Sequence, residues 1–297
     1  MKILITGSHG FVGRYFVNYF GKKDIKSLDM VDLKNGRECR AFFKENDDQY
    51  DLVIHLAAIV GGRESIEGRP LAVADNLSID SEFFQWCLKT NPKKIVYFSS
   101  SAAYPTNLQT TYAEEFWNGP VKLNEREIRF PSTSFGEPDM TYGWSKLTGE
   151  YLSQFVPNVH IFRPFSGYAY DQDLNYPFPM YVKRAVERQD PFEVWGPGTQ
   201  TRDFIHMTDV IEAVMTAVDL GITDPINLGW GRATSFIELA EMCMKAVGYE
   251  GEIKTRPDKP VGCMHRVSDN TKLLSFYKPK ITLEEGIAEA VEHYGRY

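Results

Sequence analysis

Short runs of apolar and β-branched residues alternate with longer amphipathic stretches along the first half of the chain. The short runs predict strands, which cover residues 2–6, 25–29, 51–58, 94–100 and 159–164. The longer stretches predict helices over residues 13–20, 75–89 and 142–155. Strands separated by helices indicate a parallel sheet that is covered on both faces, so the sequence predicts an α/β fold.

The 297 residues allow one large domain or two interlocked domains, and either arrangement can bury a sizeable core. With 33 basic against 40 acidic residues there is no overall positive field, so we expect no nucleic-acid partner. No signal-peptide core and no run of about 18 apolar residues is found, which predicts a cytoplasmic protein without a membrane partner. The four cysteines lack the spacing of metal ligands, so we expect reduced thiols and no metal.

A glycine-rich turn, GSHGFVG (7–13), lies between the first predicted strand and the first predicted helix. Glycines at such a place let backbone N–H groups and the positive end of the helix dipole face an anion. The turn therefore predicts a dinucleotide site, with the candidate residues Gly7, Gly10, Phe11, Val12 and Gly13. The alternative is an ordinary tight turn, because the spacing differs from the commoner G-x-G-x-x-G.

Two acidic residues follow this turn at a suitable distance for the cofactor. Asp29 is expected to close the second strand, 22 residues after Gly7, where a carboxylate bonds both ribose hydroxyls and repels a 2′-phosphate. This position favours NAD over NADP. Almost nothing is expected to join the second and third strands, so Asp32 and Leu33 are expected at the end of the third strand, near the adenine. Alternatively, Asp29 or Asp32 merely opens a turn.

The predicted strand over residues 94–100 runs into three serines, and the helix from residue 142 begins with Tyr142 and carries Lys146. These two side chains are four residues apart, so they lie on one face of the helix. A neighbouring ammonium group and a nicotinamide cation lower the pKa of a tyrosine, which makes it a base toward a sugar hydroxyl. A serine hydroxyl opposite would bond the same oxygen. The Tyr-x-x-x-Lys spacing alone is common on helices. The functional interpretation therefore depends on its combination with the glycine turn and with the serines that end the preceding strand.

At this point the chain resembles a known family, the extended short-chain dehydrogenases/reductases, which include nucleotide-sugar epimerases, dehydratases and reductases. The resemblance covers nearly the whole chain. Its motifs are GSHGFVG (7–13), HLAA (55–58), SSSAAY (99–104), YGWSK (142–146), RPFSGY (163–168), VWGPGTQTRDFIHMTD (194–209), NLGWG (227–231) and KITLEEGIAEAV (280–291).

The resemblance implies a Rossmann-type doubly wound parallel sheet with a smaller α/β substrate domain. Residues 1–163 and about 203–228 would form the NAD-binding domain. Residues 164–202 and 229–297 would form the nucleotide-sugar-binding domain. A nucleotide-diphosphate sugar would then be the substrate.

The resemblance also assigns roles to single residues. In the family the catalytic serine lies four residues before a tyrosine, which selects Ser100 with Tyr104 as the marker. Tyr142 would be the base, and Lys146 would hold the nicotinamide ribose. Further cofactor contacts would come from the HLAA motif, through Leu56, Ala57 and Ala58.

The subclasses of the family differ beside the serine. Dehydratases place an Asp-Glu pair after it, whereas this chain has Ser101 and Ala102, which speaks against a 4,6-dehydratase. The GDP-fucose synthase branch is similar in AAIVGG (57–62), but we match the places of its cysteine and histidine to Ala102 and Tyr176. The hydride machinery remains, as in the UDP-glucose 4-epimerase branch. We therefore expect an NAD-dependent C4 epimerase, with a nucleotide-sugar 4-reductase or dehydrogenase as the alternative.

Substrate contacts are expected mainly in the second half of the chain. Arg184 and Arg202 match the family's diphosphate-binding arginines, and Arg266 is a third candidate, since the fork of an arginine suits two adjacent phosphates. Ser166 stands where the family usually has an asparagine that contacts the sugar phosphate. Ser101 is expected to contact the sugar.

Residues 105–140 are expected to form a long loop or lid with little structure, in which Glu114 and Glu115 are candidates to meet the sugar. By the resemblance, helices 75–89 and 142–155 pair between subunits, which predicts a homodimer. A third hypothesis is a sensor or scaffold protein that binds dinucleotide without turnover. Such proteins often lose the tyrosine–lysine pair, which this chain keeps.

Overall fold

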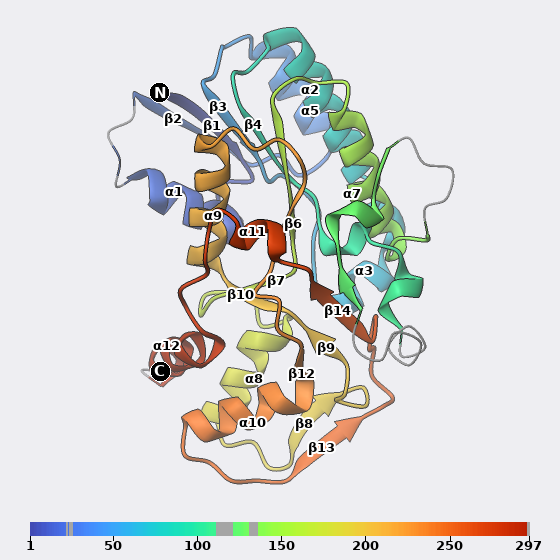
Figure 1. Cartoon of the computed structure of the whole chain (residues 1–297), viewed down its shortest axis with the longest axis vertical. Helices are drawn as coiled ribbons and strands as arrows, with labels where there is room; N and C mark the ends of the chain where they lie inside the picture. The colour runs from blue at the N-terminus through green and yellow to red at the C-terminus, as the bar shows by residue number, and fades with distance from the viewer. Residues whose placement is uncertain (22, 24–25, 111–120, 131–135, 296–297) are drawn as a thin grey trace.

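The central element of the computed structural model is a parallel sheet of six strands (Figure 1). The structure describes residues 1–21, 23, 26–110, 121–130 and 136–295. In spatial order the strands are β11 (Ile226–Leu228), β6 (Val159–Pro164), β4 (Ile95–Phe98), β3 (Leu52–His55), β1 (Lys2–Thr6) and β2 (Ser27–Val31). Every neighbouring pair runs parallel, which confirms the predicted α/β fold class.

Helices cover both faces of this sheet. One face carries α1 (Phe11–Gly21) and α9 (Met207–Asp219), which share a buried apolar cluster with the strands. The other face carries α2 (Gly36–Glu45), α5 (Asn76–Thr90) and α7 (Met140–Ser153). All four residues of β4 are therefore buried, which explains its unbroken apolar run. None of the described helices is long and apolar enough to cross a membrane.

The order of the strands places a topological switch point between β1 and β3, because the chain leaves β1 for β2 on one side and returns to β3 on the other. Ligands of open α/β sheets bind at such a point, outside the carboxyl ends of the strands. Only β2 lies beyond β1, whereas the dinucleotide-binding order 3-2-1-4-5-6 has two strands there. On the side of β2, the sheet therefore extends only one strand beyond the glycine turn.

The connection between β2 and β3 differs from the expectation. The ten-residue helix α2 joins them, so the prediction that almost nothing lies between these strands is wrong. Asn35 caps the helix by accepting a hydrogen bond from the Glu38 backbone N–H at 3.0 Å. Among the longer side chains of α2, only those of Cys39 and Phe43 are buried, one turn apart, and the other positions are mostly polar. The signals of this helix were present in the sequence, since Asn35 is followed three residues later by Glu38 and the apolar residues lie on one face, and the prediction did not use them.

A smaller layer of sheets and helices lies in the lower half of Figure 1. Its strands are β5 (Lys122–Leu123), β7 (Ser166–Tyr168), β8 (Phe192–Trp195), β9 (Thr201–Arg202), β10 (Phe204–His206), β12 (Thr234–Ser235), β13 (Ile253–Arg256) and β14 (His265–Ser268). The helices α8 (Pro177–Val186), α10 (Phe236–Ala246) and α12 (Leu283–Tyr294) bury their apolar faces in one shared cluster. Short helices complete the fold: α3 (Arg63–Gly68), α4 (Pro70–Val73), α11 (Thr271–Leu274), and the 3₁₀ turns η1 (Ser101–Ala103), η2 (Thr106–Gln109) and η3 (Glu125–Glu127).

The described part of the 105–140 segment has more structure than the sequence suggested. Strand β5 pairs in parallel with β14, so this segment adds an edge strand to the sheet β12-β9-β14-β5. The buried guanidinium of Arg163 anchors it by donating to the Glu125 carbonyl at 3.1 Å and by pairing with Glu150 at 2.7 Å. Glu114 and Glu115 lie outside the described residues.

Candidate active site

The glycine turn follows β1 at the switch point of the sheet. Gly7 has φ +71°, and a Cβ atom on it would lie 2.8 Å from the Ala57 backbone nitrogen, just beyond β3. A Cβ on Gly13 would lie 2.2 Å from the Gly7 carbonyl oxygen. Both positions therefore require glycine, and Phe11 and Val12 start α1 directly beyond the turn. This tight turn at a helix N-terminus fits the pyrophosphate of a dinucleotide.

The residues of the HLAA motif follow β3 and lie against this turn. Ala57 is buried, while Leu56 and Ala58 are half-buried. The Thr6 hydroxyl accepts hydrogen bonds from the backbone N–H groups of Leu56 and Ala57, both at 3.2 Å. The ends of β1 and β3 are thus held together, and the motif lies directly against Gly7.

The two acidic residues occupy places other than those expected. Strand β2 runs to Val31, so Asp29 lies within the strand instead of closing it. Its carboxylate accepts a hydrogen bond from the Tyr50 hydroxyl at 2.8 Å and lies 3.8 Å from the Lys2 ammonium, at the start of β1. Asp29 therefore lies two residues before the end of β2, which corrects the expectation that it closes the strand.

Asp32 directly follows β2 and not the third strand, which also corrects the expectation. Its carboxylate accepts a hydrogen bond from the His9 backbone N–H at 3.2 Å and lies 2.7 Å from the His9 imidazole. Asp32 is thus the carboxylate beside the glycine turn. Leu33 is buried in the core below α2.

Ser100 and Tyr142 come together where η1 packs on the first turn of α7. The Ala102 carbonyl accepts a hydrogen bond from the Asp139 backbone N–H at 2.9 Å. A Cβ on Gly143 would lie 2.3 Å from the same carbonyl oxygen, so a glycine beside the tyrosine permits this close contact. The Ser100 and Tyr142 side chains line the same cavity, and the Ser100 hydroxyl is close enough to lower the pKa of Tyr142. The turn and the helix start therefore aim both hydroxyls at one point.

The surroundings of Tyr142 determine its acidity. Burial raises the pKa of Tyr142 to about 12, while the hydrogen bond from Ser100 and the charge of Arg266 oppose the rise. In this environment the side chain is a protonated phenol near neutral pH. Added positive charge beside it is needed before it can serve as a base.

Lys146 lies one turn below Tyr142 and is only 4% exposed. Its ammonium lies 5.2 Å from the centroid of the Tyr97 ring, and the Tyr97 hydroxyl donates a hydrogen bond to Asp80 at 2.6 Å. Burial lowers the pKa of Lys146, and the charges of Asp80 and Glu150 counteract this. Asp80, on α5, escaped the sequence analysis because an acidic residue within an amphipathic helix carries no motif.

A cavity of about 520 Å³ opens beside these hydroxyls, between the six-stranded sheet and the smaller layer. Ser100, Ser101 and Tyr142 line this cavity. Ser166, the first residue of β7, lines it as well. Ala102 and Tyr176, which were compared with the cysteine and histidine of the GDP-fucose branch, line the same cavity. Further lining residues from the smaller layer include Trp195, Phe204 and Phe236.

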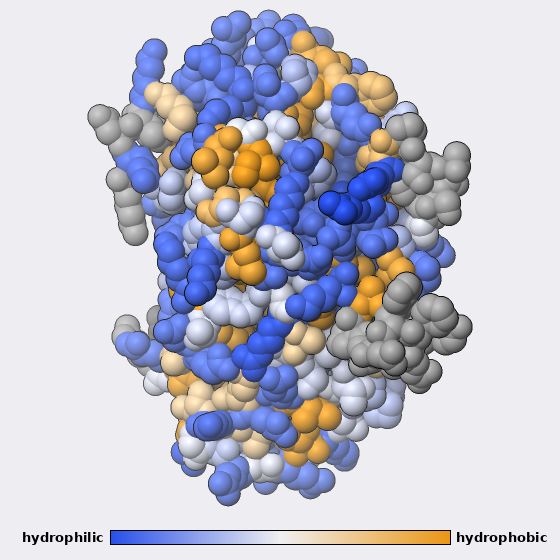
Figure 2. All heavy atoms as spheres, viewed as in Figure 1, coloured by the Kyte–Doolittle hydropathy of each residue, from blue (hydrophilic) through white to orange (hydrophobic). Residues whose placement is uncertain are grey.

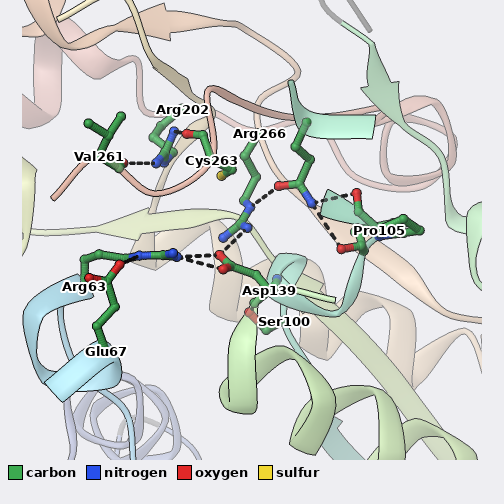
Figure 3. A network of polar contacts seen from close by, with 12 residues as sticks. Arg63, Glu67, Ser100, Pro105, Asp139, Arg202, Val261, Cys263 and Arg266 are labelled. Atoms are coloured by element: carbon green, nitrogen blue, oxygen red, sulfur yellow. Dashed lines mark hydrogen bonds and ion pairs between the residues drawn. The ribbon is translucent and has the colours of Figure 1, made fainter. Parts of the chain in front are cut away.

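Two of the three predicted arginines reach this cavity (Figure 3). Arg202 donates hydrogen bonds to the carbonyls of Thr201 at 2.7 Å and Cys263 at 2.9 Å. Arg266 pairs with Asp139 at 2.7 Å. Arg184 instead lines a separate surface pocket and donates to the Glu193 carbonyl, so the structure does not bring it to the other two.

The structure adds a residue that motif comparison missed. Arg63 starts α3, lines the cavity, and pairs with both oxygens of Asp139 at 2.7 and 3.0 Å. Asp139 itself lies three residues before Tyr142 and is 9% exposed. The available signals were the position of Arg63 right after AAIVGG and that of Asp139 at the start of α7.

A model of the NAD dependent epimerase/dehydratase family matches residues 3–229 of the chain. The chain belongs to this family. It is accordingly an NAD(P)-dependent epimerase or oxidoreductase, and the glycine turn and the tyrosine–lysine helix both lie within the matched residues.

This family member is similar along most of its length to proteins of known activity. It is 26% identical to GDP-L-colitose synthase of Yersinia pseudotuberculosis, over 99% of this chain and 98% of that protein. It is 27% identical to dTDP-4-dehydro-6-deoxy-D-allose reductase of Streptomyces bikiniensis, over 91% of this chain and 89% of that protein.

Solved structures share the fold of this family member. The UDP-glucose 4-epimerase of Thermus thermophilus, in complex with NAD, matches with a TM-score of 0.78 at 20% identity, covering 99% of both chains. A GDP-6-OMe-4-keto-L-xylo-heptose reductase from C. jejuni matches with a TM-score of 0.78 at 21% identity, covering 99% of this chain and 97% of that one. At this level of identity the likeness shows the fold.

Proposed function

We propose that this protein interconverts C4 epimers of a nucleotide-diphosphate sugar, using NAD. The observation that carries the proposal is the position of the Ser100 and Tyr142 hydroxyls on the wall of one cavity that also holds Arg202 and Arg266. One end of the cavity offers two hydroxyls for a reacting sugar oxygen, and the arginines offer a place for phosphates.

In this proposal Tyr142 takes the proton from the sugar's C4 hydroxyl, and Ser100 holds the same oxygen by a hydrogen bond. When bound, the dinucleotide supplies the chemistry of accepting a hydride from C4 and giving it back. Lys146, buried one turn further along the same helix, would hold the nicotinamide ribose, and its charge would favour the phenolate of Tyr142 in the loaded site. Rotation of the keto-sugar between the two hydride transfers would then invert C4.

We assign the cofactor edge to the glycine turn, with Gly7, Gly10 and Gly13 around the pyrophosphate. Asp32 takes the ribose hydroxyls, because it follows β2 beside that turn. A carboxylate at this place would repel a 2′-phosphate, which supports NAD over NADP. The HLAA residues Leu56, Ala57 and Ala58 would line the same crevice.

The two halves of the chain divide this work. Residues 1–163 and about 203–228 would hold the cofactor, and residues 164–202 and 229–297 would hold the nucleotide sugar. Ser101 and Ser166, both on the cavity wall, would contact the sugar or its phosphate. The halves are joined by strand pairing, β5 with β14 and β10 with β7, and by Leu273 of α11, which packs in the core of the large sheet.

A second candidate is a nucleotide-sugar 4-reductase with net turnover of NAD(P)H. The specific observation in its favour is the similarity to a dTDP-4-dehydro-6-deoxy-D-allose reductase along 91% of this chain. The same Ser100–Tyr142 pair would then donate the proton to a C4 keto oxygen. The cavity lacks the cysteine of the GDP-fucose branch, as Ala102 stands there, which argues against proton shuttling at C3 and C5.

We further propose a homodimer through α5 and α7. Large apolar side chains on these helices are exposed: Leu77, Leu88, Trp144 and Tyr151, followed by Phe155. Figure 2 shows hydrophobic atoms near α5 and α7, as one of several such areas on this face. Light scattering of the purified protein tests this, and a monomer at high concentration would contradict it.

The experiment on function has two parts. First, the purified protein is denatured and any released dinucleotide is identified by mass; bound NAD supports epimerisation, and NADP supports the reductase. Second, GDP-, UDP-, CDP- and dTDP-hexoses and their 4-keto derivatives are incubated with the protein, and the products are resolved by NMR. A C4 epimer without net cofactor turnover is expected.

Tyr142→Phe is the matched variant for this assay. It removes only the acidic hydroxyl, so turnover should fall at least about 1,000-fold while dinucleotide binding persists. Full turnover in Tyr142→Phe, or conversion of no nucleotide sugar by the unaltered protein, would overturn the proposed function.

A further inference from the structure

Four buried polar side chains form a continuous series between the six-stranded sheet and α7. The Tyr97 hydroxyl of β4 donates a hydrogen bond to one oxygen of Asp80 on α5, at 2.6 Å. The Nε2 atom of His55 lies 3.3 Å from the other oxygen of Asp80, and its Nδ1 atom lies 2.8 Å from the Thr6 hydroxyl. None of the four residues is more than 1% exposed. The series therefore runs through the core and not along the cavity wall.

The hydrogen positions in this series follow from its donors and acceptors. The Thr6 hydroxyl oxygen already accepts two backbone N–H groups of the HLAA motif, so its own hydrogen is donated to Nδ1 of His55. Nε2 then carries the ring hydrogen and donates it to Asp80. Burial lowers the pKa of His55 and raises the pKa of Tyr97 well above its ordinary value, so both groups are neutral. Two neutral donors thus hold the Asp80 carboxylate, and neither cancels its charge.

Helix α7 lies directly on this carboxylate because it has a glycine at the point of contact. A Cβ on Gly149 would overlap the Tyr97 hydroxyl oxygen and would lie 2.6 Å from an oxygen of Asp80. Lys146 stands three residues earlier, on the same side of the helix, and its ammonium lies 5.2 Å from the centroid of the Tyr97 ring. Tyr97 therefore contacts the ammonium with its ring and the carboxylate with its hydroxyl.

The charge of Asp80 is the one that is free to balance Lys146. Burial lowers the pKa of Lys146, and the charges of Asp80 and Glu150 oppose this. Glu150 is already paired, because the buried guanidinium of Arg163 donates to its two oxygens at 2.9 and 2.7 Å. A buried ammonium without a counter-charge tends to lose its proton. Asp80 is therefore placed to keep Lys146 charged.

Two further titratable groups lie near Asp80. Burial, and then the Asp80 charge, raise the pKa of the Cys39 thiol on α2 to about 12, so this group stays neutral. At the start of α7, burial raises the pKa of Tyr142 most, and the Asp80 charge adds to that rise. Asp80 thus acts in the same direction on both members of the tyrosine–lysine pair.

We propose that Asp80 is the counter-ion of Lys146, and that the Tyr97 ring is the spacer which keeps the two charges apart. A direct ion pair would draw the ammonium into the core and occupy its hydrogens. With an aromatic face in between, the charge is balanced while the ammonium stays free for the nicotinamide ribose. Asp80 is therefore a positioning residue that acts through Lys146. The inference rests on the proposed function for the role of Lys146 in catalysis.

The first test measures the pKa of Lys146 directly, by NMR titration of the protein with isotope-labelled lysine and saturating NAD. The signal of Lys146 is assigned by its loss in Lys146→Arg. Asp80→Asn removes the charge and keeps the shape, since its amide can accept from His55 and donate to the Tyr97 hydroxyl. The pKa of Lys146 should fall by about one unit in this variant. Asp80→Ser should give the same shift and covers a failure of the asparagine variant to fold.

Asp209→Asn is the matched control. Asp209 is also 1% exposed and also accepts a hydrogen bond from a tyrosine hydroxyl, that of Tyr277 at 2.7 Å, but it lies on α9, on the opposite face of the sheet. This variant should leave the pKa of Lys146 unchanged. An unchanged pKa of Lys146 in both Asp80 variants, or an equal fall in Asp209→Asn, would overturn the inference.

The second test is the pH profile of kcat, at saturating nucleotide sugar and NAD. Without the Asp80 charge, the pKa of Tyr142 and that of Lys146 should both fall. The phenolate then forms at lower pH, and the ammonium is also lost at lower pH, so the whole profile should move to lower pH by about half a unit to one unit. A purely structural defect would lower kcat at every pH, and a profile that stays in place would contradict the role of Asp80.

Failure of the proposed function would look different. If the pKa of Lys146 falls in Asp80→Asn while the unaltered protein converts no nucleotide sugar, the counter-ion stands and the proposed function is excluded. If nucleotide sugars are converted while the pKa of Lys146 and the kcat profile both stay in place in Asp80→Asn, the proposed function stands and this inference is wrong.

Discussion

The glycine turn and the arginine cluster are two anion-facing regions that are built in opposite ways. The turn consists of seven consecutive residues, and its shape comes from backbone atoms that approach too closely for any Cβ at Gly7 or Gly13. The cluster consists of charged side chains from distant segments, namely Arg63 on α3, Arg202 on β9, Arg266 on β14 and Asp139 at the start of α7. Steric exclusion therefore governs the first region, and charge balance governs the second. A single added methyl group should therefore disrupt the turn and abolish most dinucleotide binding. The arginine cluster should instead lose substrate affinity in proportion to the charge that is removed.

Gly13→Ala should have the largest effect, because the new Cβ would lie 2.2 Å from the Gly7 carbonyl oxygen and 2.7 Å from Ser8. The turn must open, so dinucleotide affinity should fall by about 100-fold or more, with a loss of roughly 1–3 kcal/mol in folding stability. Titration with NAD and thermal unfolding measure both. Gly21→Ala is the control, since no atom of the described residues lies within 4 Å of its Cβ position. Equal behaviour of the two variants would contradict a sterically determined turn.

The arginines should give a smaller and graded response. Arg202→Gln removes a cation from the cavity wall, so KM for the nucleotide sugar should rise about 30-fold with kcat less affected. Arg184→Gln should change KM by less than about twofold, because Arg184 faces a separate pocket and bonds the Glu193 carbonyl. A rise of similar size in both variants would show that Arg184 joins the site after all.

Substitutions of the two carboxylates near the glycine turn test which of them determines the preference for NAD over NADP. Asp32→Asn should narrow the preference for NAD over NADP about tenfold, because the charge that repels a 2′-phosphate is gone. Asp29→Asn should leave the preference unchanged, since Asp29 points toward Tyr50 and Lys2 within the sheet. Relative kcat/KM values with the two cofactors decide the matter. A change confined to Asp29→Asn would reverse this assignment.

The same contrast explains what could be read from the sequence. The glycine turn, most strands of the large sheet and the tyrosine–lysine pair are local patterns, so periodicity and spacing alone are enough to locate them. Asp29 was misplaced because the end of β2 is two residues further on, and a shift of that size moves a side chain along the strand without altering the apolar pattern.

The arginine cluster could be predicted only in part. Arg202 and Arg266 stand in recognisable motifs, but Arg63 and Asp139 come together only through tertiary packing of α3 on the start of α7. Arg184 carried the motif signal and lies elsewhere, since α8 turns it toward β8. Helix α2 was missed although its sequence signals it, because the N-cap Asn35 and the apolar face with Cys39 and Phe43 were interpreted as part of a minimal connection between two strands. A site made of side chains from distant segments needs the fold before its members can be named.

Arg266 allows the finest test, because its charge acts on both the anion site and the base. Burial raises the pKa of Tyr142 to about 12, and the nearby Arg266 charge opposes that rise. Removing the charge in Arg266→Gln should raise the pKa of Tyr142 further. Since Tyr142 accepts a proton as the phenolate, the alkaline rise of kcat for oxidation should then move to higher pH, by about half a unit to one unit.

The matched control for this shift is Arg202→Gln, which removes a cation of the same cluster that is not among the charges acting on Tyr142. The assays use saturating substrate and NAD, so that weaker binding does not affect the rates. The pH dependence of kcat alone is then compared between the variants. The two variants should therefore differ in the position of the profile even where both raise KM. A profile of Arg266→Gln that stays in place would mean that the cluster acts on binding only, and that the hydroxyl pair is electrostatically separate from the arginines beside it.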